Sequence, residues 1–312
     1  MLRKEPVAVI DVGSNSIKLL VAQKEAPNKS IEPIYKKTFE TRISAGIGKK
    51  DPKLTQGAMN AGCQSISELV RIARSYGPET IKIVATSAVR DASNGSEFAN
   101  RVNEATGIRL DILSGTEEAV YIGKGLRYDP DLSAMDNLVQ MDIGGGSLEL
   151  IRFNHSSIQK ACSLKLGAVR LTEQFVSDRT AVISTETETN IRTHVKELIQ
   201  ASGFNFEPLT EPMIVTGGAF SVIRSILAAQ AGTTIDKTSP VISKENITEL
   251  KATLCSLSLD KRKALPGLPE ARADVMPVAL ITIDTVLALA DRNSVTHSSY
   301  NLRYGIAVEL LA

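Results

Sequence analysis

The chain has 312 residues, of which 43% are hydrophobic and 23% are charged, and its formal net charge is +1. This length predicts two domains, each with its own hydrophobic core. A net charge near zero and an aromatic content of only 4% argue against a nucleic-acid-binding face or a platform for stacking bases. We therefore expect no nucleic-acid partner.

The cysteine content and the hydropathy pattern indicate the cellular setting. Three cysteines far apart in sequence are typical of reduced thiols rather than of a disulfide framework. An acidic residue follows the N-terminus too early for a signal peptide. The most apolar late stretch, residues 275–290, contains Asp284 and is too short to span a bilayer. We expect a cytoplasmic protein with no membrane partner.

The first half of the chain predicts a three-stranded meander followed by alternating helices and strands. Strands are expected over residues 7–11, 17–22, 31–41, 81–85 and 109–113, and helices over 54–75, over 94–105 and from residue 114 onward. Gly107 is expected to end the second of these helices. This order of elements is typical of a mixed α/β sheet.

The second half of the chain repeats this order. Strands are expected over residues 139–142, 148–154, 157–163 and 213–216, and helices over 185–201, 219–230, 246–257, 274–290 and 302–311. Residues 126–136 are rich in aspartate and contain a proline, so we expect the domain junction there.

Two glycine- and serine-rich turns form an internal repeat. The sequence D-V-G-S-N-S at 11–16 aligns without gaps on D-I-G-G-G-S at 142–147, which lies 131 residues later. A repeat at this distance predicts two related domains with one turn each. Backbone amides and hydroxyls of such turns suit phosphate oxygens. The candidate phosphate-binding residues are Gly13, Ser14, Asn15 and Ser16 in the first turn and Gly144, Gly145, Gly146 and Ser147 in the second.

Acidic residues flank the second turn. Asp142 precedes it, and Glu149 follows it in the next strand. A single aspartate at the end of a strand is commonly only a turn former, but the repeat favours a function. Two carboxylates at this spacing suit a hard divalent cation, which in turn would hold phosphate. In the first turn, Lys18 takes the place of Glu149.

Two adjacent glutamates open the helix expected at Ser114. Ser114 and Glu117 have the spacing of a capping box, which gives Glu117 a structural explanation. Glu118 has no such explanation, so it is either a surface residue that stabilises the helix dipole or a general base. Arg90 and Arg170 stand singly near strand ends, as solvated surface charges or as phosphate contacts.

Other catalytic schemes find no support in the sequence. The chain contains no G-x-S-x-G, C-x-x-C or H-E-x-x-H pattern and no Walker phosphate loop. A dinucleotide-binding turn is also excluded, because G-G-G-S leads into a strand rather than a helix. Serine-triad, zinc and dinucleotide chemistry are therefore not expected.

The motifs together resemble the exopolyphosphatase/guanosine pentaphosphate phosphohydrolase (Ppx/GppA) family of the actin-like ATPase superfamily. Besides the two turns, the resemblance rests on T-S-A-V-R-D at 86–91, S-G-T-E-E-A at 114–119, G-A-V-R-L at 167–171 and T-G-G at 216–218. It implies an α/β fold of two actin-like (ribonuclease H-like) domains with mixed sheets and an interdomain cleft. The first domain would comprise residues 1–126, with a final helix of about 300–312 packing back on it, and the second residues 127–299.

The resemblance also implies roles for the candidate residues. Glu118 would be the general base that activates water, and Asp142 and Glu149 would hold Mg²⁺, with Mn²⁺ as the alternative. The two turns would bind the terminal phosphates, while Arg90 and Arg170 neutralise charge. The implied reaction is hydrolysis of inorganic polyphosphate with release of orthophosphate, and guanosine pentaphosphate is the alternative substrate. Homodimerisation is an expectation from the resemblance alone.

Departures from the family pattern and other functions keep alternatives open. Many family members continue into a helical HD-type domain, and a short form without it is expected here, which leaves the substrate preference open. Leu148 stands where threonine is usual in the family. An actin-like kinase or ATPase, with T-G-G in an adenosine pocket, is a second hypothesis. A module that binds polyphosphate or an alarmone without turnover is a third, but an intact Glu118 argues against it.

Overall fold

The computed structural model describes residues 5–24, 31–47, 51–132, 134–207 and 210–312. The chain forms two compact units. Unit 1 contains Met1–Met135 together with Tyr300–Ala312, and unit 2 contains Asp136–Ser299. The chain passes from one unit to the other at residue 135, within the junction expected over 126–136. Arg127 ties the end of this segment to unit 1, because its Nη1 donates a hydrogen bond to the carbonyl of Met135.

Unit 1 is built on a five-stranded mixed sheet. Its strands are β1 (Val7–Val12), β2 (Ile17–Lys24), β3 (Ile31–Phe39), β4 (Thr80–Ala85) and β5 (Leu110–Ile112), in the order β3-β2-β1-β4-β5. The first three strands form an antiparallel meander, and β4 and β5 are parallel to β1. Its helices are α1 (Gln56–Arg74), α2 (Ser87–Asp91), α3 (Gly95–Thr106), α4 (Gly115–Leu126) and α11 (Leu302–Leu310).

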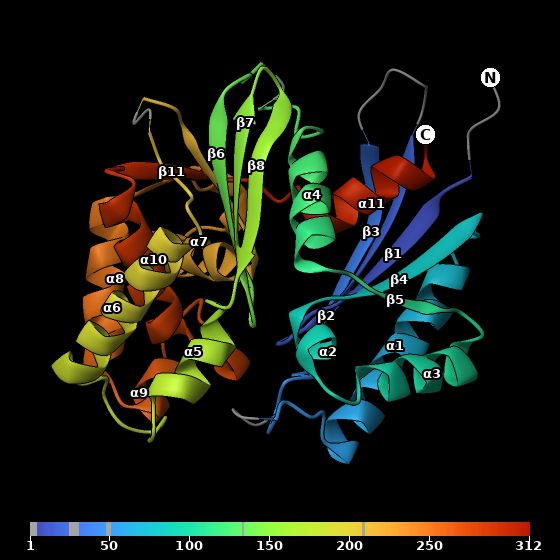
Figure 1. Cartoon of the computed structure of the whole chain (residues 1–312), viewed down its shortest axis with the longest axis horizontal. Coiled ribbons are helices and arrows are strands. Elements are labelled where there is room, and N and C mark those ends of the chain that lie inside the picture. Colours follow the sequence, from blue (N-terminus) through green and yellow to red (C-terminus); the bar gives the residue numbers. More distant parts are fainter. Residues whose placement is uncertain (1–4, 25–30, 48–50, 133, 208–209) are drawn as a thin grey trace. The chain divides into compact units, whose positions relative to one another are not determined.

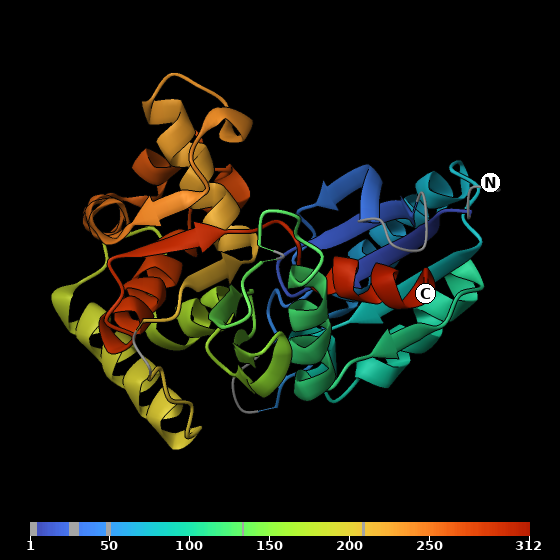
Figure 2. The same cartoon turned by 90° about the horizontal axis from the view of Figure 1, so that it is seen from above.

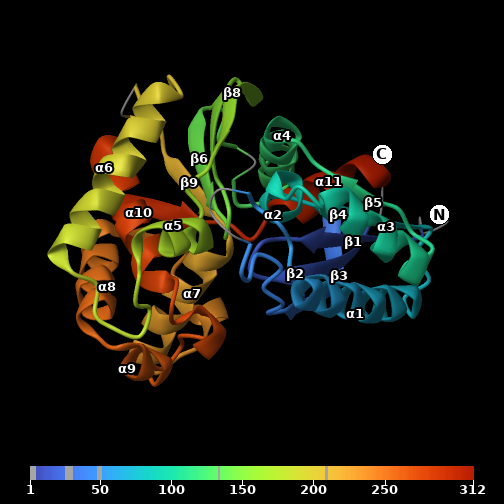
Figure 3. The same ribbon diagram turned by 60° about the horizontal axis from the view of Figure 1, so that its bottom comes forward.

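Helices cover both faces of this sheet. Figure 3 shows α1 and α3 on one face and α4 and α11 on the other. The Thr55 side chain caps α1 by accepting a hydrogen bond from Ala58 N–H, and α1 then buries apolar residues at helical spacing. Gly107 ends α3 with a positive φ of 72°, which confirms the stop predicted there.

Two glycines allow α4 and α11 to pack backbone against backbone. A Cβ atom on Gly305 of α11 would lie 1.9 Å from the carbonyl oxygen of Tyr121, and one on Gly125 of α4 would lie 2.2 Å from that of Asn301. Figure 2 shows the red helix α11 beside the green helix α4. The last helix of the chain therefore belongs to the core of unit 1.

Unit 2 repeats this arrangement with one additional strand. Its strands are β6 (Leu138–Ile143), β7 (Leu148–Asn154), β8 (Ser157–Leu164), β9 (Met213–Thr216), β10 (Val241–Ser243) and β11 (Ser294–His297), in the order β10-β11-β9-β6-β7-β8. The antiparallel meander β6-β7-β8 matches β1-β2-β3, and β9 is parallel to β6 as β4 is to β1.

The helices of unit 2 pack around one apolar helix. They are α5 (Ala168–Phe175), α6 (Thr185–Ala201), α7 (Gly218–Gln230), α8 (Lys244–Ser256), α9 (Leu259–Lys263) and α10 (Met276–Leu289), with short 3₁₀ turns at Ile235–Lys237 and Glu270–Arg272. Almost every residue of α10 is buried, and α5, α6 and α8 contact it, as the grouping in Figure 1 illustrates. In the part of the chain that the structure describes, no helix has the length and hydropathy of a membrane span.

The predicted elements are present, but several short ones escaped prediction. These are α2, α5, α9, β10, β11 and the two 3₁₀ turns. Most of them are only three to five residues long, so they cannot show a helical or strand periodicity. The strand predicted over residues 31–41 ends at Phe39, where β2 and β3 cease to pair. The helix predicted over residues 274–290 begins at Met276, with Pro277 in its first turn.

Candidate active-site residues

The two glycine- and serine-rich turns have the same backbone hydrogen bond. The N–H of Gly13 donates to the carbonyl of Ser16 at 3.1 Å, and the N–H of Gly144 donates to that of Ser147 at 3.0 Å. In both cases an antiparallel strand pair flanks the turn in the same register. The repeat in the sequence is therefore a repeat in structure.

The carbonyls of the second turn are held from one side. Backbone N–H groups at the start of α5 bond to the carbonyls of Gly144 and Gly145, at 2.8–3.0 Å. Arg170 Nε donates to the carbonyl of Gly146 at 2.8 Å. In a planar trans peptide the N–H points opposite to the carbonyl, so the N–H groups of Gly145, Gly146 and Ser147 point away from α5. Their direction suits the predicted binding of an anion.

Arg170 also has a structural role that its motif did not reveal. Its Nε holds the turn on the side of α5, through the hydrogen bond to the carbonyl of Gly146. Gly167 precedes α5, and a Cβ there would lie 2.3 Å from backbone atoms of Gly146. The G-A-V-R motif therefore packs α5 against the turn. A contact of Arg170 with phosphate stays a prediction.

The first turn is held by side chains from other segments. The carbonyl of Ser14 accepts hydrogen bonds from Ser44 N–H at 3.2 Å and from Ser44 Oγ at 3.0 Å, so the N–H of Asn15 points away from Ser44. Ser14 Oγ and Ser87 Oγ lie 3.0 Å apart. The Asn15 side chain is bonded to Arg42 and Glu40, at 2.8 and 3.2 Å.

These contacts refine the prediction for the first turn. The side-chain amide of Asn15 is engaged within the protein, so a phosphate contact by this residue would use its backbone N–H. Ser44 and Ser87 were not predicted. Their contacts cross 30 and 73 residues of sequence, and no local motif signals such pairs.

The two predicted metal ligands stand in a polar row across unit 2. In the sheet register Thr216, Asp142, Glu149 and Ser163 are successive neighbours on β9, β6, β7 and β8. The hydroxyl of Thr216 donates to Asp142 Oδ2, and Ser163 Oγ donates to Glu149 Oε1 at 2.7 Å. Glu149 is only 1% exposed. Thr216 was noted as part of T-G-G, but neither hydroxyl was predicted as a partner of these carboxylates, because the register of the strand pairs brings them together.

The donor set of this row fits a hard divalent cation. Two carboxylates directly opposite each other on neighbouring strands repel, and a cation bound by both would relieve the repulsion. Carboxylate oxygens are ligands that Mg²⁺ accepts, together with water and substrate phosphate. Over the described residues, no group of three or more His, Cys, Asp and Glu side chains is arranged to hold a metal.

The equivalent place in unit 1 carries its own cations. Asp11 pairs across the strands with Lys18, as Asp142 pairs with Glu149. Burial raises the pKa of the Asp11 carboxyl, and the positive charges of Lys18 and of Arg303 from α11 partly offset this rise. Arg303 is fixed there by a hydrogen bond from its Nη1 to the carbonyl of Leu19 at 3.1 Å. The first turn is thus supplied with protein cations where the second offers carboxylates.

Glu118 and Arg90 form the third part of the candidate site. The capping box predicted at the start of α4 is present, with Glu117 bonded back to the N–H of Ser114 at 2.8 Å. Glu118 is buried, 6% exposed, and its Oε2 accepts a hydrogen bond from Arg90 Nη1 at 2.7 Å. The same Nη1 donates to the carbonyl of Leu113 at 3.0 Å. The structure therefore brings together the predicted base and the predicted phosphate-binding arginine within unit 1.

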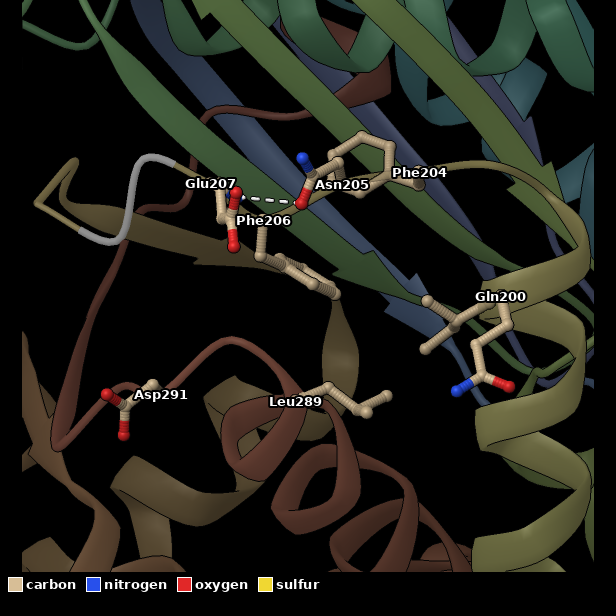
Figure 4. Close-up of a pocket in the computed structure, with 8 residues that line it drawn as sticks. Gln200, Phe204, Asn205, Phe206, Glu207, Leu289 and Asp291 are labelled. Atoms are coloured by element: carbon tan, nitrogen blue, oxygen red, sulfur yellow. Dashed lines mark hydrogen bonds between the residues drawn. The ribbon is translucent and has the colours of Figure 1, made fainter.

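A cavity elsewhere in unit 2 contains none of the predicted residues. Its volume is about 260 Å³, and Figure 4 shows it between the end of α6, the segment that follows α6, and the end of α10. It is lined by Ile199, Gln200, Phe204, Asn205, Phe206, Glu207, Leu289 and Asp291. The lining combines aromatic and aliphatic side chains with two carboxylates and no basic group, so it does not suit a phosphate substrate.

The comparison with known families decides the assignment. Residues 3–312 match the model of the Ppx/GppA phosphatase family. The chain belongs to this family. The Ppx/GppA motifs identified above lie in the two turns, in α2, at the start of α4, at the start of α5 and between β9 and α7. The resemblance predicted from these motifs is therefore confirmed.

Two curated relatives are longer proteins. The chain is 29% identical over 288 residues to a bifunctional 3-dehydroquinate synthase/phosphatase of Fusobacterium nucleatum, covering 90% of this chain and 43% of the relative. It is 28% identical over 312 residues to a guanosine-5′-triphosphate,3′-diphosphate pyrophosphatase of Vibrio atlanticus, covering 97% of this chain and 59% of the relative. The chain thus spans about half the length of these relatives.

Solved structures share the fold along the entire chain. An exopolyphosphatase from Cytophaga hutchinsonii superposes with a TM-score of 0.86 at 24% identity, covering 98% of each chain. The Ppx/GppA enzyme of Aquifex aeolicus superposes with a TM-score of 0.79 at 22% identity, covering 98% of this chain and 99% of that one. The predicted α/β fold of actin-like type with mixed sheets is therefore confirmed, while the interdomain cleft stays a prediction.

Proposed function

We propose that this Ppx/GppA phosphatase hydrolyses the terminal phosphoanhydride bond of inorganic polyphosphate and releases orthophosphate. The observation that carries the proposal is the buried carboxylate of Glu118, held by Arg90 in the unit that contains the first turn. A buried glutamate fixed by an arginine is suited to accept a proton from water. Membership of a phosphatase family supports a hydrolytic reaction.

In the proposed reaction, Glu118 accepts a proton from a water molecule as the water oxygen attacks the terminal phosphorus. The bond from that phosphorus to the bridging oxygen breaks, and the shortened chain leaves with that oxygen. The N–H groups of Gly145, Gly146 and Ser147 bind phosphate oxygens where negative charge must be stabilised. Arg90 keeps the carboxylate of Glu118 in a single orientation. Positioning and charge stabilisation are the main requirements of phosphoryl transfer.

We further propose that Asp142 and Glu149 hold Mg²⁺, with Mn²⁺ as the alternative ion. When bound, the ion would supply positive charge for the phosphate oxygens. The hydroxyls of Thr216 and Ser163 fix the two carboxylates for this purpose, because each donates a hydrogen bond to one of them.

Guanosine pentaphosphate is the second candidate substrate. The name of the Vibrio atlanticus relative, a guanosine-5′-triphosphate,3′-diphosphate pyrophosphatase, favours it. It would be hydrolysed by the same chemistry at its terminal phosphate. An ATPase or kinase activity and binding without turnover remain alternatives. A cytoplasmic location and a homodimer likewise stay predictions; three free cysteines are consistent with the location.

Replacement of Glu118 tests the assigned base. Glu118→Gln keeps the shape and an acceptor for Arg90 but removes the proton-accepting charge, so turnover should fall by a factor on the order of 100 to 10,000. Glu117→Gln is the matched control, because glutamine also serves in a capping box and should leave turnover unchanged. Full activity of Glu118→Gln in a phosphate-release assay would show that another group is the base.

The substrate and the metal are tested in the same assay. The protein is incubated with polyphosphates of defined length, with guanosine pentaphosphate and with ATP, each with Mg²⁺, with Mn²⁺ or with a chelator. The proposal expects phosphate release from polyphosphate and loss of release with the chelator. Release only from guanosine pentaphosphate would favour the second candidate, and release only from ATP the ATPase. No release from any substrate would favour binding without turnover.

A further inference from the structure

The two turns are braced by matching arginines that lie in unrelated sequence motifs. Arg42 follows β3, and Arg170 follows β8, the equivalent strand of unit 2. The Nε–H of each arginine donates a hydrogen bond to the residue before the serine that ends the turn. Arg42 bonds to Asn15 Oδ1 and Arg170 to the carbonyl of Gly146, both at 2.8 Å. Asn15 and Gly146 occupy equivalent positions, 131 residues apart.

A second hydrogen bond from the same segments completes the match. In unit 1 the N–H of Ser44 donates to the carbonyl of Ser14 at 3.2 Å. In unit 2 the N–H of Arg170 donates to the carbonyl of Gly145, the equivalent residue, at 3.0 Å. The segment after the third strand therefore holds each turn at the same two places. The surrounding sequences, E-T-R-I-S and G-A-V-R-L, share no pattern beyond the arginine.

The first unit differs in using a side chain as the link. Asn15 takes the place of a glycine, and its amide is bonded at both ends, because Oδ1 accepts from Arg42 and Nδ2 donates to Glu40 Oε2 at 3.2 Å. Asn15 is 8% exposed, so loss of Arg42 would leave a buried carbonyl oxygen without this donor. Because the donor is a guanidinium, the hydrogen bond is also of the stronger, charge-assisted kind.

We propose that Arg42 is a positioning residue of the first phosphate-binding turn and the unit 1 counterpart of Arg170. It acts through Asn15, whose backbone N–H points away from Ser44 and is the group expected to contact substrate phosphate. This inference rests on the proposed function, since it assigns Arg42 to substrate binding in that reaction. Water activation by Glu118 does not involve it.

Steady-state kinetics with inorganic tripolyphosphate test this role. Arg42→Ala should raise KM by on the order of tenfold and leave kcat within about twofold, because a binding contact kept through the reaction is lost. Asn15→Ala should do the same. The double variant should have a KM no higher than that of either single variant, because both substitutions remove the same contact between Arg42 and Asn15. Additive effects would overturn the proposal, since they would mean that Arg42 acts independently of Asn15.

Two substitutions separate geometry from charge. Arg42→Lys keeps the charge but loses the Nε donor, so it should retain most of the KM defect. Full recovery of KM by lysine would overturn the proposal, because charge alone would then suffice. Lys37→Ala is the matched control: it removes a positive charge from an exposed residue of β3 that lies over the ring of Phe39. It should leave KM unchanged.

A binding measurement keeps this inference distinct from the proposed function. The dissociation constant of tripolyphosphate is measured by calorimetry for Glu118→Gln with and without Arg42→Ala, after thermal unfolding has shown both to be folded. A tenfold weaker affinity in the double variant supports the positioning role even if the wild type hydrolyses nothing. Equal affinities would overturn it while leaving hydrolysis intact. No binding by either variant would overturn both proposals.

Discussion

At the scale of single residues, Asp11 and Asp142 show how a duplicated site has diverged. Both stand next to last in the first strand of a meander, and each pairs with the second residue of the next strand. Asp11 faces Lys18, whose positive charge partly offsets the cost of burying the carboxyl. Asp142 faces Glu149, so two carboxylates stand opposite each other. One half of the repeat therefore places a protein cation beside its aspartate, where the other places a second acid.

Glu149→Gln should abolish the response to metal without unfolding unit 2. A glutamine carbonyl can still accept the hydrogen bond from Ser163, while the repulsion with Asp142 is removed. Affinity for Mg²⁺ should fall by at least about 100-fold, since even loss of an indirect partner of a ligand costs 10- to 100-fold. Thermal unfolding with and without Mg²⁺ measures this. An equal Mg²⁺-induced rise in Tm for variant and wild type would contradict the assignment of Glu149.

Gly217→Ala should displace the side chain of Asp142, because the added Cβ would lie too close to it. Gly217 has φ of 102°, and a Cβ there would lie 2.6 Å from the carbonyl oxygen of Ile143 and 3.0 Å from Asp142 Oδ1. We expect a loss of about 1–3 kcal/mol in the free energy of unfolding and a marked fall in phosphate release.

Gly232→Ala is the control for this substitution. Its φ of 63° is also positive, but it lies outside the glycine-only region that Gly217 occupies with φ of 102° and ψ of 166°, and a Cβ at Gly232 meets nothing within 4 Å. The difference between the two variants in urea denaturation and in turnover measures the added cost at Gly217, from its contacts and its backbone conformation together. Equal losses in both variants would show that neither the contacts nor the conformation of Gly217 adds a cost.

The site residues that sequence predicted are those inside local motifs. The glycine turns, the capping box and the second glutamate of E-E-A are recognised because their chemistry depends on spacing along the chain. Ser44 and Ser163 are not, because segment packing or strand pairing brings them to their partners. Thr216 stands in T-G-G, but its hydrogen bond to Asp142 depends on the pairing of β6 with β9. Arg42 belongs to the same class, as its contact with Asn15 spans 27 residues.

At the scale of elements, the crossing of α4 and α11 depends on two glycines. Gly305→Ala places a Cβ 1.9 Å from the carbonyl oxygen of Tyr121, which is backbone and cannot rotate aside. We expect a loss of about 3 kcal/mol, the upper end for overpacking, in urea denaturation. Gly57→Ala in α1 is the control, because its added Cβ meets nothing and alanine favours helix by about 1 kcal/mol. Equal effects of the two changes would show that the helices can separate at little cost.

A partly buried charge network joins α6, α8 and α10. Arg192 of α6 and Lys251 of α8 both lie within ion-pair distance of Glu188 and Asp284. Burial raises the pKa of the Asp284 carboxyl, but the hydrogen bond and charge of Arg192 and the charge of Lys251 outweigh it, so the net pKa is lowered. A carboxyl with a lowered pKa stabilises the fold above its unfolded pKa and loses that contribution as the pH falls through the folded value.

Asp284→Asn should therefore destabilise the protein in a pH-dependent way. At pH 7 the variant should lose about 1.5–3 kcal/mol, because its hydrogen bond from Arg192 loses the carboxylate charge while Arg192 and Lys251 keep Glu188 as a partner. The deficit should shrink as the pH falls below about 4, where the carboxyl of the unfolded wild type takes up a proton before that of the folded protein does. Urea denaturation of both proteins at pH 7 and pH 3 measures this. A deficit of constant size across that range would mean that the charge of Asp284 is not what stabilises the three helices.

At the scale of the whole molecule, the internal repeat in the sequence predicted two units. It could not predict that the end of the chain returns to complete the first of them. The 131-residue offset predicts equal halves, yet unit 1 is completed by α11 from the far end of the chain. Only the family resemblance predicted that the last helix packs on the first domain, because no local property of residues 302–310 indicates which sheet they contact. The strands β10 and β11, which extend the second sheet, were missed because they are too short to show a strand periodicity.

Removal of residues 300–312 should destabilise unit 1 selectively. The truncation takes away α11, whose buried residues Leu302, Tyr304 and Ile306 belong to unit 1, and it leaves α4 and strands β1 and β2 without the helix that contacts them. Hydrogen exchange followed by mass spectrometry should show lost protection in β1, β2 and α4 and native protection in β6, β7 and α10, because unit 2 is one continuous segment with its own core. Equal loss in both units would instead mean that they fold as one cooperative structure.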